Sequence, residues 1–208
     1  MPEYGDVAYW NRRFERETTF EWLAPYSVFE QSLCSVLASP SSEKQVLHLG
    51  CGTSQLPIQL FQSGYTHIIH TDISPNLIEK QAQQYPCLQW QVVNALELDD
   101  VFPRQSMDVV FEKSVTDAIL CDDDEDQSKF NRLQHQIFKV LKPGGVWWMM
   151  SYSKERHFHP SLWKINQIEH VIVDAGGAEH VDSKQSSVTY RPCISHCIYV
   201  VEALPFCL

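Results

Sequence analysis

A short apolar stretch followed at once by two closely spaced glycines constrains the fold of this chain more than any other feature. Residues 45–49 have the pattern of a buried strand, and Gly50 and Gly52 allow a tight turn directly after it. Residues 55–63 then carry apolar side chains at helical spacing, with a proline near the first turn. The pattern predicts a strand–turn–helix unit.

The same alternation of strand and helix repeats along the chain. Further strands are expected over residues 66–72, 88–93, 107–112, 146–150, 186–190 and 197–203. Further helices are expected over residues 75–85, 130–141 and 160–175. Such alternation implies parallel strands with helices on both faces of one sheet, so the predicted fold class is α/β, doubly wound.

The length of the chain fits a single domain over residues 1–208. The usual range is roughly 100–200 residues per domain, and this chain has 208. Residues 1–42 are rich in aromatic side chains and end in a small polar patch typical of a linker, so we expect an N-terminal helical segment there. The alternating core is expected over residues 43–208.

The charge and the cysteines exclude several classes of protein. Because 26 acidic and 16 basic residues give a net charge of -10, the chain repels phosphate backbones, and we expect no nucleic-acid partner. The longest apolar run, residues 146–150, is far shorter than the roughly 20 residues of a membrane span. The start of the chain lacks a secretory signal pattern, and the seven scattered cysteines fit a reducing compartment. We therefore expect a cytoplasmic protein without a membrane partner, and a monomer.

The predicted turn after the first strand is a candidate nucleoside site. Ligands of open parallel sheets bind outside the carboxyl ends of the strands, where Gly50 and Gly52 bring backbone amides close to a ligand. Asp72 ends the second predicted strand, 22 positions after Gly50, where a carboxylate can accept hydrogen bonds from both hydroxyls of a ribose. The third glycine of a dinucleotide fingerprint is absent, because Ser54 and Gln55 stand there, which argues against a dinucleotide. A purely structural role for the two glycines is the alternative.

Several parts of the chain resemble class I S-adenosylmethionine-dependent methyltransferases. They are VLHLGCGTS (residues 46–54), Asp72 and VLKPGG (residues 140–145). Three further motifs resemble a group of small enzymes that methylate protein lysines: YWNRRF (residues 9–14), FEWL (residues 20–23) and EKSVTDA (residues 112–118). That group includes enzymes acting on translation elongation factor 1-alpha and on citrate synthase. The resemblance covers about residues 4–203. It implies a Rossmann-like, mostly parallel seven-stranded sheet with an antiparallel last strand, S-adenosyl-L-methionine as the methyl donor and S-adenosyl-L-homocysteine as the product.

The resemblance also implies which residues hold the donor. The expected cofactor-binding residues are Trp22, Gly50, Cys51, Gly52, Ser54, Asp72, Ile73, Asn94, Ala95, Glu112 and Lys113. The two glycines pass beneath the methionine part of the donor, Asp72 holds the ribose, and Ile73 packs on the adenine. Asn94 contacts the adenine amino group, and Trp22 covers the donor together with Tyr4.

Two further implied roles lie at the end of the fourth predicted strand. Glu112 is expected to act on the sulfonium, and Lys113 to pair with a neighbouring acid. The chain also departs from the family here, because Ser114 and Val115 stand where glycine and threonine are common. His48 stands where the family usually has an acid. The donor side thus matches the family, and the acceptor side differs from it.

Methyl transfer determines what the acceptor side must provide. The reaction is an in-line displacement whose barrier falls through positioning and desolvation, and the acceptor amine must be neutral. An aromatic channel lowers the pKa of a lysine, and Asp117 can orient the amine or accept its proton. The expected catalytic residues are Asp117 and Glu112. A helix cap or surface acid is the alternative reading of Asp117.

Three other clusters are weighed in the same way. Residues 122–126 are five consecutive acids that would steer a basic protein surface, with a solvated loop as the alternative. His157 and His159 lack cysteine or carboxylate partners at ligand spacing, so no metal site is expected. Cys193 and Cys197 are expected to be packed thiols.

The combined pattern favours methylation of a lysine side chain in a protein partner with a basic surface. The flanking motifs, the acidic run and the lack of a separate substrate domain support this hypothesis. A small-molecule acceptor is the first alternative, because the changed residues 114–115 and the aromatic N-terminus suit an enclosed pocket. A donor-binding module without transferase activity, suggested by His48, is the second.

Overall fold

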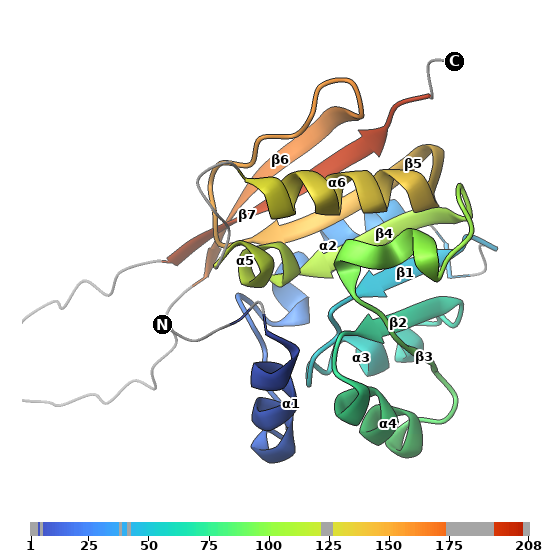
Figure 1. The fold of residues 1–208 in the computed structure, drawn as a ribbon, viewed down its shortest axis with the longest axis vertical. Coiled ribbons are helices and arrows are strands. Elements are labelled where there is room, and N and C mark those ends of the chain that lie inside the picture. Colours follow the sequence, from blue (N-terminus) through green and yellow to red (C-terminus); the bar gives the residue numbers. More distant parts are fainter. Residues whose placement is uncertain are drawn as a thin grey trace, which may run out of the picture.

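The computed structural model describes residues 4, 6–37, 39–40, 43–121, 127–173 and 194–205 (Figure 1). Their helices are α1 (Val7–Arg16), α2 (Tyr26–Leu37), α3 (Leu56–Gln62), α4 (Pro75–Gln84), the 3₁₀ helix η1 (Ala95–Asp100), α5 (Val115–Leu120) and α6 (Ser128–Val140). Their strands are β1 (Val46–Leu49), β2 (Ile68–Asp72), β3 (Gln89–Val92), β4 (Met107–Lys113), β5 (Leu141–Ser151), β6 (Trp163–Val173) and β7 (Ile194–Ala203).

The seven strands of the described residues form one sheet in the order β3-β2-β1-β4-β5-β7-β6. Strands β1 to β5 pair in parallel, and β7 pairs antiparallel with both β5 and β6. The prediction of a doubly wound, mostly parallel α/β sheet with an antiparallel last strand is confirmed. The chain runs from β1 outward to β3 and then returns to β4, so the strand order reverses between β1 and β4. Ligands of such sheets bind at this point of reversal.

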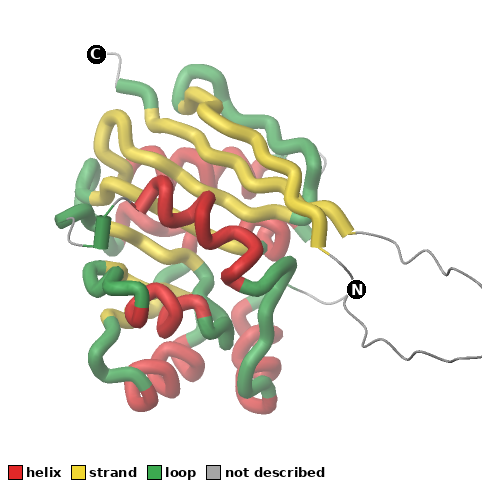
Figure 2. The backbone as a smooth tube through the Cα atoms, turned by 180° about the vertical axis from the view of Figure 1, so that it is seen from behind, coloured by secondary structure: helices red, strands yellow, loops and turns green. Residues whose placement is uncertain are grey.

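Helices cover both faces of the sheet, as Figure 2 shows from behind. On one face, α6 buries Leu133 and Ile137 against the central strands. On the other face, α2 and α3 bury Phe29, Leu33 and Leu60. The predicted helices at residues 55–63, 75–85 and 130–141 correspond to α3, α4 and α6. The apolar stripes of α3 and α6 face the core of the sheet, and Leu77 and Ile78 of α4 pack in a smaller cluster with Phe14 and Cys51.

The N-terminal segment packs on the sheet at one end and on a helix at the other. Trp148 of β5 is fully buried, lies 5.5 Å from the ring of Phe29 in α2, and donates its indole N–H to Oγ of Ser32 at 3.1 Å. Farther toward the N-terminus, Oδ1 of Asn11 in α1 accepts a hydrogen bond from Oγ of Ser74, the residue that caps α4. The residues between α1 and α2 are thereby held beside the carboxyl ends of the strands.

The helix predicted over residues 160–175 is wrong, because residues 163–173 form β6 and pair with β7 along their whole length. Ile165, Ile168 and Ile172 are three and four positions apart, which is helical spacing. A β-bulge just after Ile165 inserts one extra residue into the strand. The three isoleucines consequently share one strand face, and their partners on β7 are Val201, Tyr199 and Ser195.

Other predictions concern the end of the chain and its organisation. The strand predicted over residues 186–190 lies outside the described residues, whereas the strand predicted over residues 197–203 is confirmed as part of β7. The division into residues 1–42 and 43–208 within one domain stays a prediction. In the part of the chain that the structure describes, no helix combines the length and the apolar character needed to cross a bilayer.

Candidate functional site

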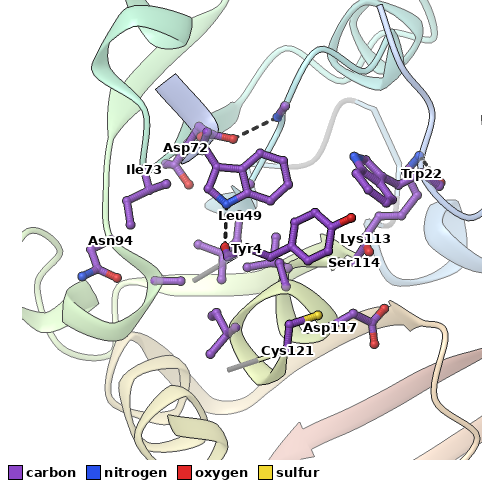
Figure 3. Close-up of a pocket in the computed structure, with 18 of the residues that line it drawn as sticks. Tyr4, Trp22, Leu49, Asp72, Ile73, Asn94, Lys113, Ser114, Asp117 and Cys121 are labelled. Carbon is purple, nitrogen blue, oxygen red and sulfur yellow. Dashed lines mark hydrogen bonds between the residues drawn. The ribbon is translucent and has the colours of Figure 1, made fainter. Parts of the chain in front are cut away.

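A cavity of about 460 Å³ opens at the carboxyl ends of β1, β2 and β4. It is lined by the turn after β1, the end of β2, the start of η1, helix α5 and the N-terminal segment. Figure 3 shows Asp72, Ile73 and Asn94 on one side of it, with Trp22 and Lys113 across from them. The volume lies within the roughly 300–1,000 Å³ of small-molecule sites. Because the strand order reverses here, the cavity lies where the topology predicts a ligand.

The two glycines of the turn after β1 have different tasks. Both have a left-handed backbone, with φ of +60° at Gly50 and +53° at Gly52. A Cβ on Gly50 would overlap Cγ2 of Val115, so only glycine lets the turn approach α5. A Cβ on Gly52 would meet no described atom within 4 Å, and Gly52 lines the cavity. The open space beside Gly52 suits a ligand that passes close to the backbone.

Asp72 holds its carboxylate between two backbone amides at the edge of the cavity. Its Oδ2 accepts the N–H of Gly52 at 3.0 Å, and its Oδ1 accepts the N–H of Ser74 at 3.1 Å. Burial raises the pKa of Asp72 to about 6, although the amide hydrogen bonds act to lower it. Each carboxylate oxygen can accept two hydrogen bonds, so the carboxylate retains acceptor capacity for ligand hydroxyls.

The wall of the cavity next to Asp72 is apolar. Ile73, Val93, Ala95 and Leu96 line it together with Asn94. Oδ1 of Asn94 accepts the N–H of Leu96 at 3.0 Å and so caps η1, and the same oxygen keeps a second lone pair that can accept a hydrogen bond from a ligand. An apolar wall with one amide at its rim suits a planar aromatic base.

Lys113 at the end of β4 is buried and fully hydrogen-bonded. Its Nζ donates to Oε2 of Glu21 at 2.7 Å and to the carbonyl oxygens of Trp22 and Ala24 at 2.8 and 3.2 Å. Burial lowers the pKa of Lys113, and the charge of Glu21 opposes that shift. The acid expected beside Lys113 is therefore Glu21, and all three ammonium protons hold residues 21–24 in place.

Glu21 is a site residue that the sequence analysis did not single out. Besides the ion pair with Lys113, its carboxylate accepts the Oγ–H of Ser54 at 2.9 Å and the N–H of Gln55 at 2.7 Å. Glu21 thus joins the N-terminal segment to the turn after β1 and to the end of β4. It lies in the run of residues 20–23 that carries the family resemblance, but an acid between two aromatics gives no sign of a partner 92 positions away.

Glu112 supports the helix beside the cavity and does not line the cavity itself. It is fully buried, its Oε2 accepts the N–H of Val115 at 2.8 Å, and its Oε1 accepts the Oγ–H of Thr116 at 2.6 Å. Burial raises the pKa of Glu112 to about 7. Ser114 has a φ of +72°, a left-handed conformation that the glycine common in the family adopts without strain.

The predicted cofactor-binding residues fall into two sets by position. Those that line the cavity are Trp22, Gly50, Gly52, Asp72, Ile73, Asn94, Ala95 and Lys113. Cys51, Ser54 and Glu112 are not among the residues that line the cavity. Tyr4, the expected cover, also lines the cavity, and its carbonyl oxygen accepts the indole N–H of Trp10 at 2.6 Å. Contact of these residues with a donor stays a prediction.

Asp117 in α5 lines the cavity with its carboxylate engaged. Oδ1 accepts the Oγ–H of Ser151 at 2.6 Å and an N–H of Arg156, and Oδ2 accepts the N–H of Tyr152 at 2.9 Å. These contacts join Asp117 to residues 151–156 and differ from those of a helix-capping residue, one alternative reading of Asp117. Asp117 instead ties the segment after β5 to α5, at the end of the cavity where Tyr152 lies.

His48 in β1 does not line the cavity. Its Nδ1 lies 3.0 Å from Nδ1 of His70 in β2, and its ring stacks on Phe111 with 4.3 Å between the centroids. Burial lowers the pKa of His48 well below its usual range and that of His70 to about 3. Both rings are therefore neutral near pH 7, and the exchange of the family's acid for His48 is accommodated inside the sheet.

Of the remaining clusters, residues 122–126 and Cys193 lie outside the described residues. Cys197 is buried, with its Sγ 3.3 Å from Nδ1 of His170. Within the described ranges, no three histidine, cysteine, aspartate or glutamate side chains gather in a way that would hold a metal ion.

Comparison with known proteins points to one family. A family model described as "Methyltransferase domain" matches residues 40–196. The methyltransferase srdJ of Neurospora crassa is 36% identical over 171 residues, which are 78% of this chain and 72% of that protein. The mouse EEF1A lysine methyltransferase 4 is 30% identical over 178 residues, 77% of this chain and 68% of that protein. The bovine eEF1A lysine and N-terminal methyltransferase is also 30% identical over 178 residues, but this chain spans only 25% of its length.

Solved structures share the fold at low sequence identity. One is described by the conversion of a disulfide bond into a thioacetal group during echinomycin biosynthesis, with a TM-score of 0.65, 14% identity, and coverage of 95% of this chain and 92% of that one. A SAM-dependent methyltransferase from Methanosarcina mazei has a TM-score of 0.56, 15% identity, and coverage of 83% and 97%. At these identities the likeness establishes the fold alone.

Replacing Glu21 with alanine is expected to lower the free energy of unfolding by about 1–3 kcal/mol, because the buried ammonium of Lys113 then loses its carboxylate. Urea unfolding measures the change. The matched control is Glu30→Ala on the exposed side of α2, which should stay within about 0.5 kcal/mol of wild type. An equally small effect of Glu21→Ala would contradict a stabilising role of the ion pair between Glu21 and Lys113.

Replacing Glu112 with glutamine is expected to flatten the pH dependence of stability. The folded pKa of Glu112, about 7, lies above the usual 4.5, so the folded state keeps a proton that the unfolded state releases. Stability therefore falls as pH rises from about 4.5 to 7, with a slope of up to about 1.4 kcal/mol per pH unit from this group. Urea unfolding at several pH values in this window measures the slope.

The control for this measurement is Glu202→Gln. The hydrogen bond from Asn166 and the nearby Lys164 hold the pKa of Glu202 below its usual value, so that substitution should leave the slope unchanged in the same window. Equal slopes for wild type and Glu112→Gln would show that Glu112 is ionised in the folded protein.

Proposed function

Because the chain belongs to the family of S-adenosylmethionine-dependent methyltransferases, we propose that it methylates the side-chain amine of a lysine in a protein. The observation that carries the proposal is the 30% sequence identity to two eEF1A lysine methyltransferases, which extends over more than three quarters of this chain. The acceptor is accordingly expected to be a basic protein such as an elongation factor, presented as a side chain that enters the cavity.

The cavity suits the methyl donor at three points. The free acceptor positions of Asp72 fit two ribose hydroxyls, and the apolar wall with Asn94 fits the adenine. The open space beside Gly52 fits the methionine part, and a side chain there would fill it. When bound, S-adenosylmethionine supplies a methyl group made reactive by a sulfonium. The lining residues of the chain hold and orient that group.

Residues at the other end of the cavity would receive the lysine. Tyr152 and the two aromatic residues expected to cover the donor, Tyr4 and Trp22, present rings that would attract an ammonium. Loss of water favours the neutral amine, the form in which the nitrogen has a free lone pair. We expect Asp117, held in place by Arg156, to orient the amine. Glu112 would act as a positioning residue that fixes the start of α5.

Charge supports a basic protein partner. The net charge of -10 attracts a positive surface and steers its approach. In the sequence, the acidic residues 122–126 follow Cys121, the residue after α5, and they lie outside the described residues. Such a partner would bring its lysine to the end of the cavity beside α5.

A small-molecule acceptor is the second candidate. The observation that favours it is the lining of the cavity, in which Trp10, Phe14 and Leu23 add apolar surface to the other aromatic side chains. Apolar linings with few polar groups are typical of sites for small ligands. The two candidates differ in whether the methylated product is a protein.

Replacing Asp72 with alanine is expected to weaken binding of S-adenosylmethionine and S-adenosylhomocysteine about 10- to 100-fold, because hydrogen bonds to a charged group are lost. Isothermal titration calorimetry measures both affinities. With its folded pKa near 6, Asp72 becomes protonated as pH falls through 6, so wild-type affinity should fall there. Asp72→Asn, which cannot ionise, should show a flat profile over this range. Absence of binding by the wild type would end the methyltransferase proposal.

Transfer is tested with donor labelled at its methyl group. Wild type is expected to label lysine in purified elongation factor 1-alpha or in another basic protein of a cell lysate, with the modified residue located by mass spectrometry. The control Asp72→Ala should label at least about tenfold less, in line with its weaker binding. Label found only in the small-molecule fraction would support the second candidate. Donor binding without any transfer would indicate a donor-binding module.

A further inference from the structure

Strand β6 forms one edge of the sheet, and its outer side is open among the residues that the structure describes. Among the described residues it is last in the strand order and pairs on one side alone, with β7. Figure 1 shows it along the border of the molecule. Most of its 11 residues are exposed. An open strand of this length offers unpaired backbone N–H and C=O groups to another strand.

One face of β6 carries a row of exposed isoleucines. The bulge brings Ile165, Ile168 and Ile172 onto this face, where 48%, 48% and 67% of each residue is exposed. None of the three belongs to a buried cluster of the core. A single exposed isoleucine is ordinary, but a row of them along an open edge is typical of a surface that meets a partner.

We propose that the outer edge of β6 pairs antiparallel with β6 of a second copy of this chain. A twofold axis normal to the sheet relates the copies, so residues that meet across it lie on the same face of the sheet. Centred on the bulge, this register sets Ile165 opposite the partner's Ile168. It also sets Lys164 opposite the partner's Glu169. By symmetry each contact occurs twice, and one sheet continues through both copies.

Lys164 and Glu169 are available for this pairing. Both lie on the face opposite the isoleucines, where their partners on β7 are Glu202 and Ile198. The side chain of Lys164 is 61% exposed and forms an ion pair with Glu202 at 3.6 Å, and Oε2 of Glu169 accepts a hydrogen bond from Nε2 of Gln167 at 3.3 Å. Both contacts lie near the surface, where an ion pair contributes little and can be exchanged for another. Within one copy, Lys164 and Glu169 lie four ladder positions apart, about 13 Å, which is too far for an ion pair. They can meet only across the axis.

The arrangement favours a copy of this chain over an unrelated partner because it is self-complementary. Lys164 and Glu169 lie two ladder positions from the bulge, on opposite sides of it. Ile165 and Ile168 each lie one ladder position from the bulge, between it and one of the charged residues. Opposite charges and matched apolar side chains across a strand pair stabilise the pairing. The proposal differs from the monomer expected from the sequence, because the edge position of β6 becomes visible only in the sheet. This proposal does not depend on the methyltransferase function.

Sedimentation velocity over about 1–100 μM tests the proposal. Wild type is expected to dimerise in this range. Lys164→Glu and Glu169→Lys should each raise the dimer dissociation constant about tenfold or more, because each places two pairs of like charges across the axis. The double variant Lys164→Glu with Glu169→Lys should restore an affinity near wild type. Lys164 and Glu169 are too far apart within one copy to form an ion pair, so restored dimerisation of the double variant would come from contacts between the copies.

Controls separate association from folding. Arg104→Glu, an exposed charge reversal on the loop after η1, should leave dimerisation unchanged. Thermal unfolding checks every variant, because Lys164→Glu also faces Glu202 within its own copy. Glu169→Lys meets no such repulsion among the described contacts and keeps the test decisive if the first variant folds poorly.

Three results would overturn the proposal. The first is a monomer at all concentrations with β6 amides exchanging freely. The second is a monomer with protected β6 amides, which would mean that another part of this chain covers the edge. The third is a dimer that ignores both charge reversals, which would mean that a different surface associates.

Discussion

The ion pair between Glu21 and Lys113 is the interaction on which the cavity depends. Lys113 ends the central strand β4, and Glu21 belongs to the segment between α1 and α2. Through the same carboxylate, Glu21 also holds Gln55 at the start of α3. Three segments far apart in the chain therefore meet at one carboxylate. Breaking this pair would leave the buried ammonium of Lys113 without its opposite charge. The ion pair therefore stabilises the positions of residues 21–24 and of the turn after β1.

A second constraint is the close approach of the turn after β1 to helix α5. Gly50 permits it, and the buried carboxylate of Glu112 accepts the first amide of α5, so the helix starts directly against the turn. Asp117 then reaches the cavity from the first turn of α5 and fixes the segment after β5. The two acids expected to be catalytic thus have well-defined positioning contacts within the chain.

Residues at the ends of strands could be predicted together because the carboxyl ends of parallel strands meet at one edge of a sheet. Gly52, Asp72 and Asn94 follow three different strands, and all line one cavity. The same reasoning cannot tell which way a side chain at such an end turns. Glu112 follows the pattern as well as Asp72 does, yet its partners in α5 draw it away from the cavity.

The sequence by itself determined the fold class, the tight turn after β1 and the set of strand ends that carry the cavity. These features depend on the local spacing of apolar residues and on the backbone freedom of glycine. Only the tertiary structure decided that Glu21 is the partner of Lys113, that Glu112 supports α5, and that residues 163–173 are a strand. Each of these depends on contacts between distant residues. In β6, the bulge after Ile165 places Ile165, Ile168 and Ile172 on one face of the strand, although their spacing in the sequence is that of a helix.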